Sequence, residues 1–182
     1  MEFLLRVSRG IDRVSVAVGR AAAWLILASV AISAANATSR KLFDAASNAW
    51  LELQWYLFGA AFLLAAAYTL QRGEHIRIDI VSAALPERMR NWIDLAGHVL
   101  MLLPFTLLMI VETTPFVLES FRLQETSSSY GGLILWPAKA LILLGFLMLF
   151  VQGLSEIIKR VAIMRGIMEE PRPPGGGGHA HP

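Results

Sequence analysis

The sequence predicts an all-α integral membrane protein with four transmembrane helices. Of its 182 residues, 55% are hydrophobic and only 16% are charged, whereas a soluble domain carries about 25% charged residues. The apolar residues gather in long runs, and a helix needs about 20 mostly apolar residues to cross the hydrocarbon core. The five tryptophans lie near the ends of these runs, where amphipathic rings favour the membrane–water boundary.

The four apolar runs differ in their content of ionisable residues. The spans are predicted at residues 21–39, 53–71, 95–118 and 133–155. The first two contain no charged residue, so hydrophobicity alone identifies them. The third contains Glu112, with His98 near its start, and the fourth contains Lys139 near its start.

Lysine and arginine are distributed unequally between the two ends of the predicted bundle. Twelve of the 16 fall in the N-terminal arm, the second connector and the C-terminal tail, and four fall on the other side. The positive-inside rule therefore predicts that both termini and residues 71–94 face the cytoplasm. Signal-peptide cleavage near Ala35-Asn36-Ala37 is an alternative for the N-terminus, and it would leave the other three helices oriented as before.

Two amphipathic segments are predicted to lie in the membrane interface. In the N-terminal arm, residues 1–20, one side of the helical wheel is apolar and another is basic. The apolar side carries Phe3, Val7, Ile11, Val14 and Val18, and the basic side carries Arg6, Arg9, Arg13 and Arg20. A solvated extension of the first span is the alternative interpretation of this arm.

The second amphipathic segment, "PERMRNWID", begins at Pro86, a residue suited to the first position of a helix. We expect it to bend into the membrane and Pro104 to kink the span that follows. The four-helix domain covers residues 21–158. Residues 159–182 form a cytoplasmic tail whose composition, rich in proline and glycine, predicts disorder from about residue 169.

Polar residues inside a membrane span are costly, so each is a candidate for a functional or locking role. Glu52, Glu112 and Lys139 fall at similar depth, and we expect Lys139 to pair with Glu112 or Glu52 and fix helix register. A proton or ion path along these residues is the competing interpretation. His98 is predicted to be hydrogen-bonded or to face the interface, because haem ligation between facing helices would need a second histidine.

The connector after the second span, "QRGEHIRIDIV" at residues 71–81, is the densest mixed-charge segment of the chain. Gly73 is placed to end the second helix as a left-handed cap. The next residues alternate charged side chains with isoleucines, which favours an extended piece. The segment is either an interfacial linker whose isoleucines enter lipid, or a docking element whose charged residues form ion pairs.

Several functional classes lack support in the sequence. The chain has no cysteine, which excludes disulfides, thiolate catalysis and cysteine-ligated metals. A net charge of +2 without a basic and aromatic cluster argues against nucleic acid. No phosphate-binding loop, dinucleotide fingerprint, nucleophile elbow or zinc-protease motif occurs. We expect no enzymatic activity, no cofactor and no resident metal.

The order of these features resembles the DctQ-type small membrane subunit of tripartite ATP-independent periplasmic (TRAP) transporters. Glu52 opens the second span, "GEHIRIDI" closes it, and "WPAKALILLGFLMLFVQGLSEIIK" forms the last span. The piece at residues 74–79 is the most specific match, because it corresponds to the E-H-[VI]-R-[VI]-D signature of that family. The resemblance covers about residues 13–160.

This resemblance implies partners rather than independent transport. A DctM-type large permease with many spans would carry the solute, driven by a sodium gradient, and a DctP-type periplasmic protein would deliver it. The solute would be an organic acid or a similar molecule, and the chain would lie in the bacterial inner membrane in contact with lipid. The residues expected to serve docking or structure are Glu52, Glu74, His75, Arg77, Asp79, Glu112 and Lys139.

Two other functions compete with this interpretation. A small proton-coupled multidrug exporter also has four helices, but such chains are shorter and carry a glutamate in the first helix, which is uncharged here. A membrane anchor of a redox complex would use His98 as a haem or quinone ligand. Substitution of Glu112 would abolish the transport activity of an exporter, and substitution of His98 would remove the haem absorbance of a cytochrome.

Overall fold

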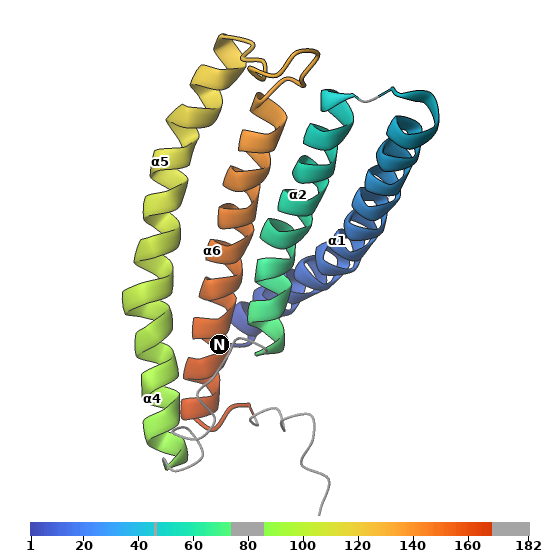
Figure 1. Cartoon of the computed structure of the whole chain (residues 1–182). Helices are drawn as coiled ribbons and strands as arrows, with labels where there is room; N and C mark the ends of the chain where they lie inside the picture. Colours follow the sequence, from blue (N-terminus) through green and yellow to red (C-terminus); the bar gives the residue numbers. More distant parts are fainter. Residues whose placement is uncertain (46, 74–85, 169–182) are drawn as a thin grey trace, which may run out of the picture.

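A computed structural model describes residues 1–45, 47–73 and 86–168 of the chain (Figure 1). The helical elements are α1 (Glu2–Phe43), α2 (Asn48–Arg72), α4 (Glu87–Gly97), the π-helical turn η1 (His98–Leu102), α5 (Leu103–Arg122) and α6 (Trp136–Met164). Within the described residues, four helical stretches are long and apolar enough to cross a membrane. The predicted all-α fold with four spans is therefore confirmed for this part of the chain.

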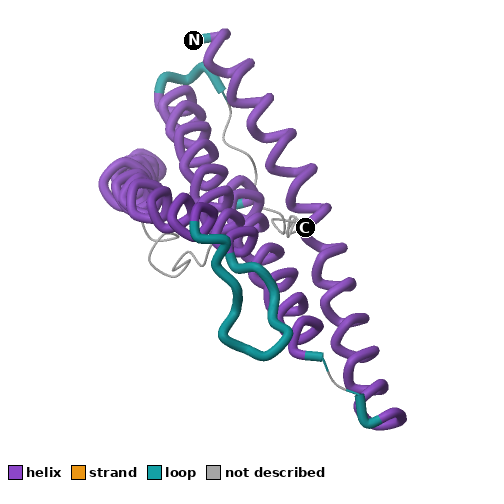
Figure 2. Tube along the Cα trace, turned by 90° about the horizontal axis from the view of Figure 1, so that it is seen from above, coloured by secondary structure: helices purple, strands orange, loops and turns teal. Residues whose placement is uncertain are grey.

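The helices form an open row. Figure 1 shows them side by side in the order α5, α6, α2 and α1, and α6 packs against both α5 and α2. Seen from above in Figure 2, α1 is strongly inclined and runs along one side of the other helices, where it contacts α6 as well as α2. The N-terminus lies on the same side of the bundle as the C-terminal ends of α2 and α6, and this side is called here the N-terminal end. Residues 123–135 lie at the opposite end, called the hairpin end.

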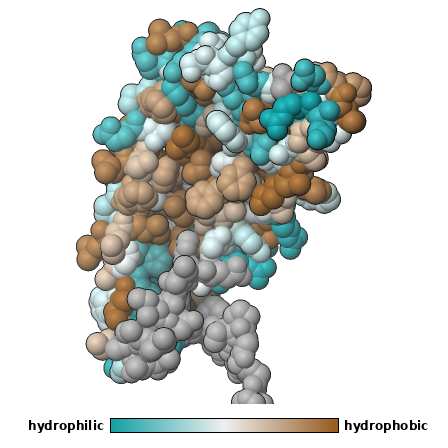
Figure 3. Space-filling model, viewed as in Figure 1, coloured by the Kyte–Doolittle hydropathy of each residue, from teal (hydrophilic) through white to brown (hydrophobic). Residues whose placement is uncertain are grey.

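Small side chains fill the contacts between helices. On α1, the buried residues Ser8, Ser15, Ala22 and Ser29 recur every seven residues. Large apolar side chains point outward instead, and hydrophobic residues predominate over the middle of the face in Figure 3. This distribution is typical of membrane helices, which approach each other through small residues because lipid already solvates the large ones.

At Gly145, α6 approaches α2 closely. A Cβ at this position would lie 2.8 Å from Cβ of Leu63 and 3.3 Å from its carbonyl oxygen. We expect Gly145→Ala to lower the free energy of unfolding in detergent by about 1–3 kcal/mol, the usual cost of overpacking. Gly59→Ala on α2 is the matched control, because a Cβ there would meet no atom within 4 Å. Equal stability of the two variants would contradict this close crossing.

The N-terminal arm and the first span form one helix. α1 has 42 residues without a break, which corresponds to about 63 Å, roughly twice the thickness of the hydrocarbon core. The helix must therefore be inclined or extend beyond the hydrocarbon. The interfacial position of its first 20 residues stays a prediction.

The third span is also longer than predicted, because α4, η1 and α5 follow one another without interruption. In Figure 1 the amphipathic segment and the span form one column rather than two separate helices. The π-helical turn lies directly before Pro104, where the sequence predicts a kink. A proline ring crowds the carbonyl four residues earlier, and the wider turn accommodates it. Just after Pro104, the hydroxyl of Thr106 donates to the carbonyls of Leu102 and Leu103 at 2.7 and 3.1 Å.

Gly73 ends α2 as predicted. It adopts a left-handed conformation with φ of 67°, and its N–H donates to the carbonyl of Leu70 at 3.1 Å. Glycine reaches this conformation without the steric cost that a Cβ would impose. The extended connector expected after it and the disordered tail expected from about residue 169 lie outside the described residues.

Candidate docking and helix-locking sites

Three of the seven residues predicted to serve docking or structure are described. Glu52 and Lys139 lie at the hairpin end, and Glu112 lies on the outward face of α5. The other four fall outside the described residues and stay predictions: Glu74, His75, Arg77 and Asp79. The structure therefore places Glu52 and Lys139 in one region and Glu112 apart from them.

Residues 123–135 fold back as a short hairpin between α5 and α6. An isolated antiparallel bridge joins Thr126 to Ile134. On either side of it, the N–H of Ser127 donates to the carbonyl of Leu133 at 2.9 Å, and the N–H of Leu135 donates to the carbonyl of Glu125 at 2.8 Å. These bonds leave the turn of the hairpin facing the start of α2.

Glu52 locks this hairpin onto α2. One carboxylate oxygen accepts a hydrogen bond from the hydroxyl of Ser127, and the other accepts one from the N–H of Leu133 at 2.6 Å. Gly132 is required beside it, because a Cβ there would lie 2.9 Å from the Glu52 carboxylate. The side-chain amide of Asn48 adds a bond to the carbonyl of Tyr130 at 3.0 Å. Glu52 thus ties the hairpin to the start of α2, and its role in docking or structure stays a prediction.

The predicted partner of Lys139 is wrong. Lys139 pairs with Glu125 of the hairpin rather than with Glu112 or Glu52, and its Nζ lies 3.9 Å from the centroid of the Phe116 ring. The reason is geometric, since Lys139 lies in the first turn of α6 beside the base of the hairpin. Glu112 lies deeper along α5 and is exposed. An acidic residue in a short connector next to an intramembrane lysine is the signal that could have identified Glu125.

The Lys139–Glu125 pair makes the hairpin sensitive to pH. The hydrogen bond from Lys139 lowers the pKa of the Glu125 carboxyl below its ordinary value. The pair therefore stabilises the hairpin above the unfolded pKa, and this stabilisation is lost as the pH falls through the lower folded pKa. We expect the hydrogen-exchange protection factor of the Leu135 N–H to stay constant from about pH 7 down to the ordinary glutamate pKa of about 4.3, and to fall at lower pH. In Lys139→Gln the protection factor should depend less on pH. A pH profile of the variant identical to that of the wild type would contradict the pairing.

A second polar cluster joins α1 to α6 at the N-terminal end, and the sequence analysis missed it. The cluster comprises Ser8, Asp12, Ser15, Gln152, Ser155, Glu156 and Lys159, and it is called here the α1–α6 cluster. The hydroxyls of Ser8 and Ser155 lie 2.6 Å apart. The hydroxyl of Ser15 donates to Oε1 of Gln152 at 2.7 Å, and Nε2 of Gln152 donates to Asp12 at 2.9 Å. Gln152 is completely buried, so these bonds satisfy a group that would otherwise be costly.

Charged groups complete the α1–α6 cluster. The ammonium of Lys159 donates to the two carboxylate oxygens of Asp12 at 3.1 and 3.2 Å and to Glu156 at 2.5 Å. All three side chains are less than one-fifth exposed. A single cation thus bridges two carboxylates from different helices. The sequence does carry a signal for this cluster, because Gln152, Ser155, Glu156 and Lys159 share one face of a helix and the serines of α1 recur every seven residues.

A further ion pair ties α4 to the end of α6. The guanidinium of Arg160 lies 2.7 Å from a carboxylate oxygen of Asp94 and donates to Asn91 at 2.8 Å. His98, one turn further along, is hydrogen-bonded through Nδ1 to the backbone carbonyl of Asp94, as the sequence predicts. Within the described residues, no group of three His, Asp or Glu side chains could hold a metal ion.

The chain matches one protein family, described as "Tripartite ATP-independent periplasmic transporters, DctQ component", over residues 29–162. The match covers well over half of the chain and includes α2, the connector after it, the third span and nearly all of α6. No curated protein and no solved structure gave a significant match to the chain. Together with the four apolar helices, the family match establishes a multi-pass membrane protein. The chain therefore belongs to the DctQ family, the small membrane component of TRAP transporters.

Proposed function

We propose that this chain packs against the large DctM-type subunit of a TRAP transporter and stabilises it during solute uptake. The large subunit carries the solute, an organic acid or a similar molecule, and a gradient of an ion such as sodium drives the transport. A DctP-type periplasmic protein delivers the solute. Membership of the DctQ family supports each of these partners.

The observation that carries the proposal is the open packing of the helices. Within the described residues, only 6% of the apolar stretch of the third span is buried inside the chain, and even in α6 the fraction is 22%. A carrier would build a substrate site near the midplane from broken helices, whereas the polar clusters described above lie at the two ends. An open row of apolar helices suits a subunit that completes its packing against another membrane protein.

The two end clusters favour a rigid supporting role. At the hairpin end, Glu52 ties the connector between α5 and α6 to α2. At the N-terminal end, Lys159 ties α6 to α1. A row of helices fixed at both ends can anchor the static part of a partner while another part of that partner moves.

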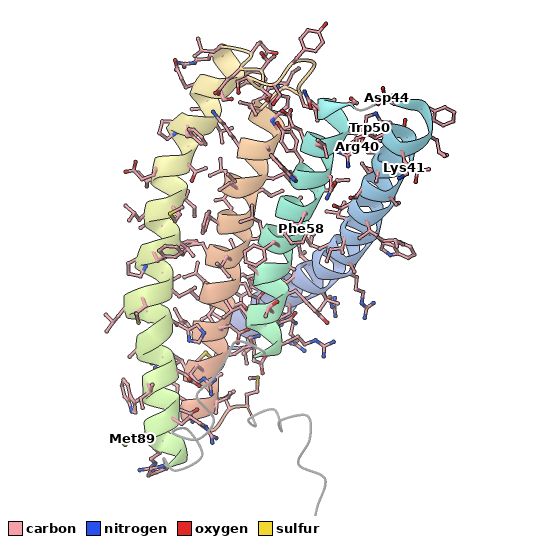
Figure 4. All side chains as sticks on the ribbon, viewed as in Figure 1. Arg40, Lys41, Asp44, Trp50, Phe58 and Met89 are labelled. Carbon is pink, nitrogen blue, oxygen red and sulfur yellow. The ribbon has the colours of Figure 1, made fainter. Side chains whose placement is uncertain are left out.

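We place the N-terminal end in the cytoplasm and the hairpin end in the periplasm of a bacterial inner membrane. The basic residues support this orientation, because most of them lie at the N-terminal end. Figure 4 shows two of the few basic residues of the other end, Arg40 and Lys41, where α1 approaches α2, and Met89 at the opposite end on α4. The acidic Asp44 accompanies that pair, which reduces the net positive charge of the hairpin end.

Uptake in intact cells tests the proposal. Cells that lack this chain but retain both partners should lose uptake of the solute, which a thermal-shift screen of organic acids on the purified binding protein would identify. Expression of the wild-type chain should restore uptake. Full uptake in the deletion strain, with normal amounts of the large subunit, would contradict the proposed function.

A further inference from the structure

The outward face of α5 carries a carboxylate inside a membrane span. Glu112 is exposed and makes no hydrogen bond or ion pair with any described residue. It lies on a stripe with Met101, Phe105 and Leu108, which are 74%, 52% and 56% exposed. These positions follow at intervals of three or four residues, so they form one continuous face turned away from the buried Thr106 and Thr113. Phe105, at the edge of this face, also packs against Phe146 of α6.

Glu112 lies too deep in the span for its carboxylate to reach the lipid headgroups. Phe121 and Trp136 form an edge-to-face pair at the hairpin end, at the height where interfacial aromatic residues are expected. Glu112 lies nine residues further into the helix, about 14 Å along its axis. The hydrocarbon core is about 30 Å thick, so the carboxylate lies near its middle. A glutamate side chain is too short to reach either surface from there.

A second polar group lies beside this carboxylate. Pro115 is inside α5 and has no N–H, so the carbonyl of Val111 lacks its usual donor four residues later. Val111 directly precedes Glu112 in the chain. In lipid an unsatisfied carbonyl is costly, and the neighbouring carboxylate makes the same patch an acceptor site for a donor from outside the chain.

The same stripe is hollowed at its inner end. An apolar hollow of about 620 Å³ lies against the π-helical turn, and its lining includes Met101, Pro104, Phe105 and Leu108. All lining residues come from α4, η1 and α5, so no other helix of the described chain closes the hollow. The stripe therefore combines space for large apolar side chains with an acceptor site one to two turns away.

We propose that this stripe of α5 is the docking face for one transmembrane helix of the large subunit, and that this helix presents a positively charged side chain to Glu112. The inference rests on the proposed function and assigns the contact surface within it. The complementary charge is required because a carboxylate in hydrocarbon needs either a partner or a proton. The cation would donate to Glu112 and to the Val111 carbonyl, and apolar side chains of the same helix would fill the hollow.

The test uses the full chain co-expressed with the large subunit of its own transporter and purified in mild detergent. We expect Glu112→Leu to reduce recovery of the large subunit about tenfold or more, because the partner cation would be left buried without its counter-charge. Glu112→Gln should give an intermediate loss, since the amide retains a hydrogen-bond acceptor. Elution of each variant as a single folded species in the absence of the partner separates loss of docking from loss of folding.

Site-specific photo-crosslinking locates the contact independently. A photoreactive residue at Leu108, on the stripe, should form an adduct with the large subunit. The same residue at Leu107 is the matched control, because it is similarly exposed at the same depth but points to a different side of α5. Its adducts should be with lipid.

The outcomes separate the two claims. If Glu112→Leu recovers the large subunit as well as wild type and Leu108 crosslinks only to lipid, the stripe faces lipid and the inference is overturned, while the proposed function stands. If the wild-type chain recovers no large subunit, both fail.

Discussion

Lys159→Met should give the largest loss of stability among single substitutions of the ionisable residues. The change removes the cation that pairs with both Asp12 and Glu156, and both carboxylates are mostly buried. Removing one partner of a buried charge pair is far more costly than removing both. We expect the free energy of unfolding in detergent to fall by about 2–4 kcal/mol. Chemical denaturation followed by tryptophan fluorescence would measure this loss.

Two further variants make the test specific to the cluster. Lys41→Met removes an exposed lysine from the other end of α1 and should change stability by less than about 0.5 kcal/mol. Adding Asp12→Asn to Lys159→Met removes one uncompensated carboxylate and should restore part of the lost stability. If the double variant lost as much stability as the sum of the losses in Asp12→Asn and Lys159→Met, the two residues would not interact.

Glu52→Ala should detach the hairpin from α2. The substitution leaves the part-buried N–H of Leu133 and the hydroxyl of Ser127 without an acceptor, and a hydrogen bond to a charged group contributes about 1.5–3 kcal/mol. Hydrogen exchange at the Leu133 amide would report the change directly, and its protection should drop sharply. Glu52→Gln should retain part of the protection, because its carbonyl oxygen can still accept one of the two bonds.

The control for this prediction is Glu119→Ala. Glu119 lies near the same end of the molecule on an exposed part of α5, so its removal should leave the Leu133 amide protected. If Glu52→Ala also left that amide protected, the hairpin would be held by its own backbone bonds alone.

Features with local physical causes could be predicted from the sequence. The four spans follow from apolar runs, because transfer into hydrocarbon depends on the residues of one segment. The end of α2 follows from Gly73, whose left-handed conformation is a local property. Glu52 and Lys139 were identified because an ionisable residue at a membrane span is rare enough to require an explanation.

Pairings between distant segments could not be predicted in the same way. The partner of Lys139 depends on how residues 123–135 fold back, and nothing in either span indicates that geometry. The α1–α6 cluster joins residues 137 or more positions apart, such as Ser15 and Gln152. The sequence analysis assigned the α1 residues of the cluster to an amphipathic interfacial arm and gave those of α6 no pairing role. The inclination of α1, which brings those ends together, goes with its contacts to α2 and α6.

The measurement that tests the central claim most directly is purification of this chain from its native membranes in mild detergent, with quantitative mass spectrometry of the proteins that accompany it. Our account predicts one large permease with many spans in near-equal molar amount. Recovery of the chain alone or as a homo-oligomer would contradict it and favour a self-contained exporter. A coloured preparation with redox subunits would contradict it as well and would direct attention to His98.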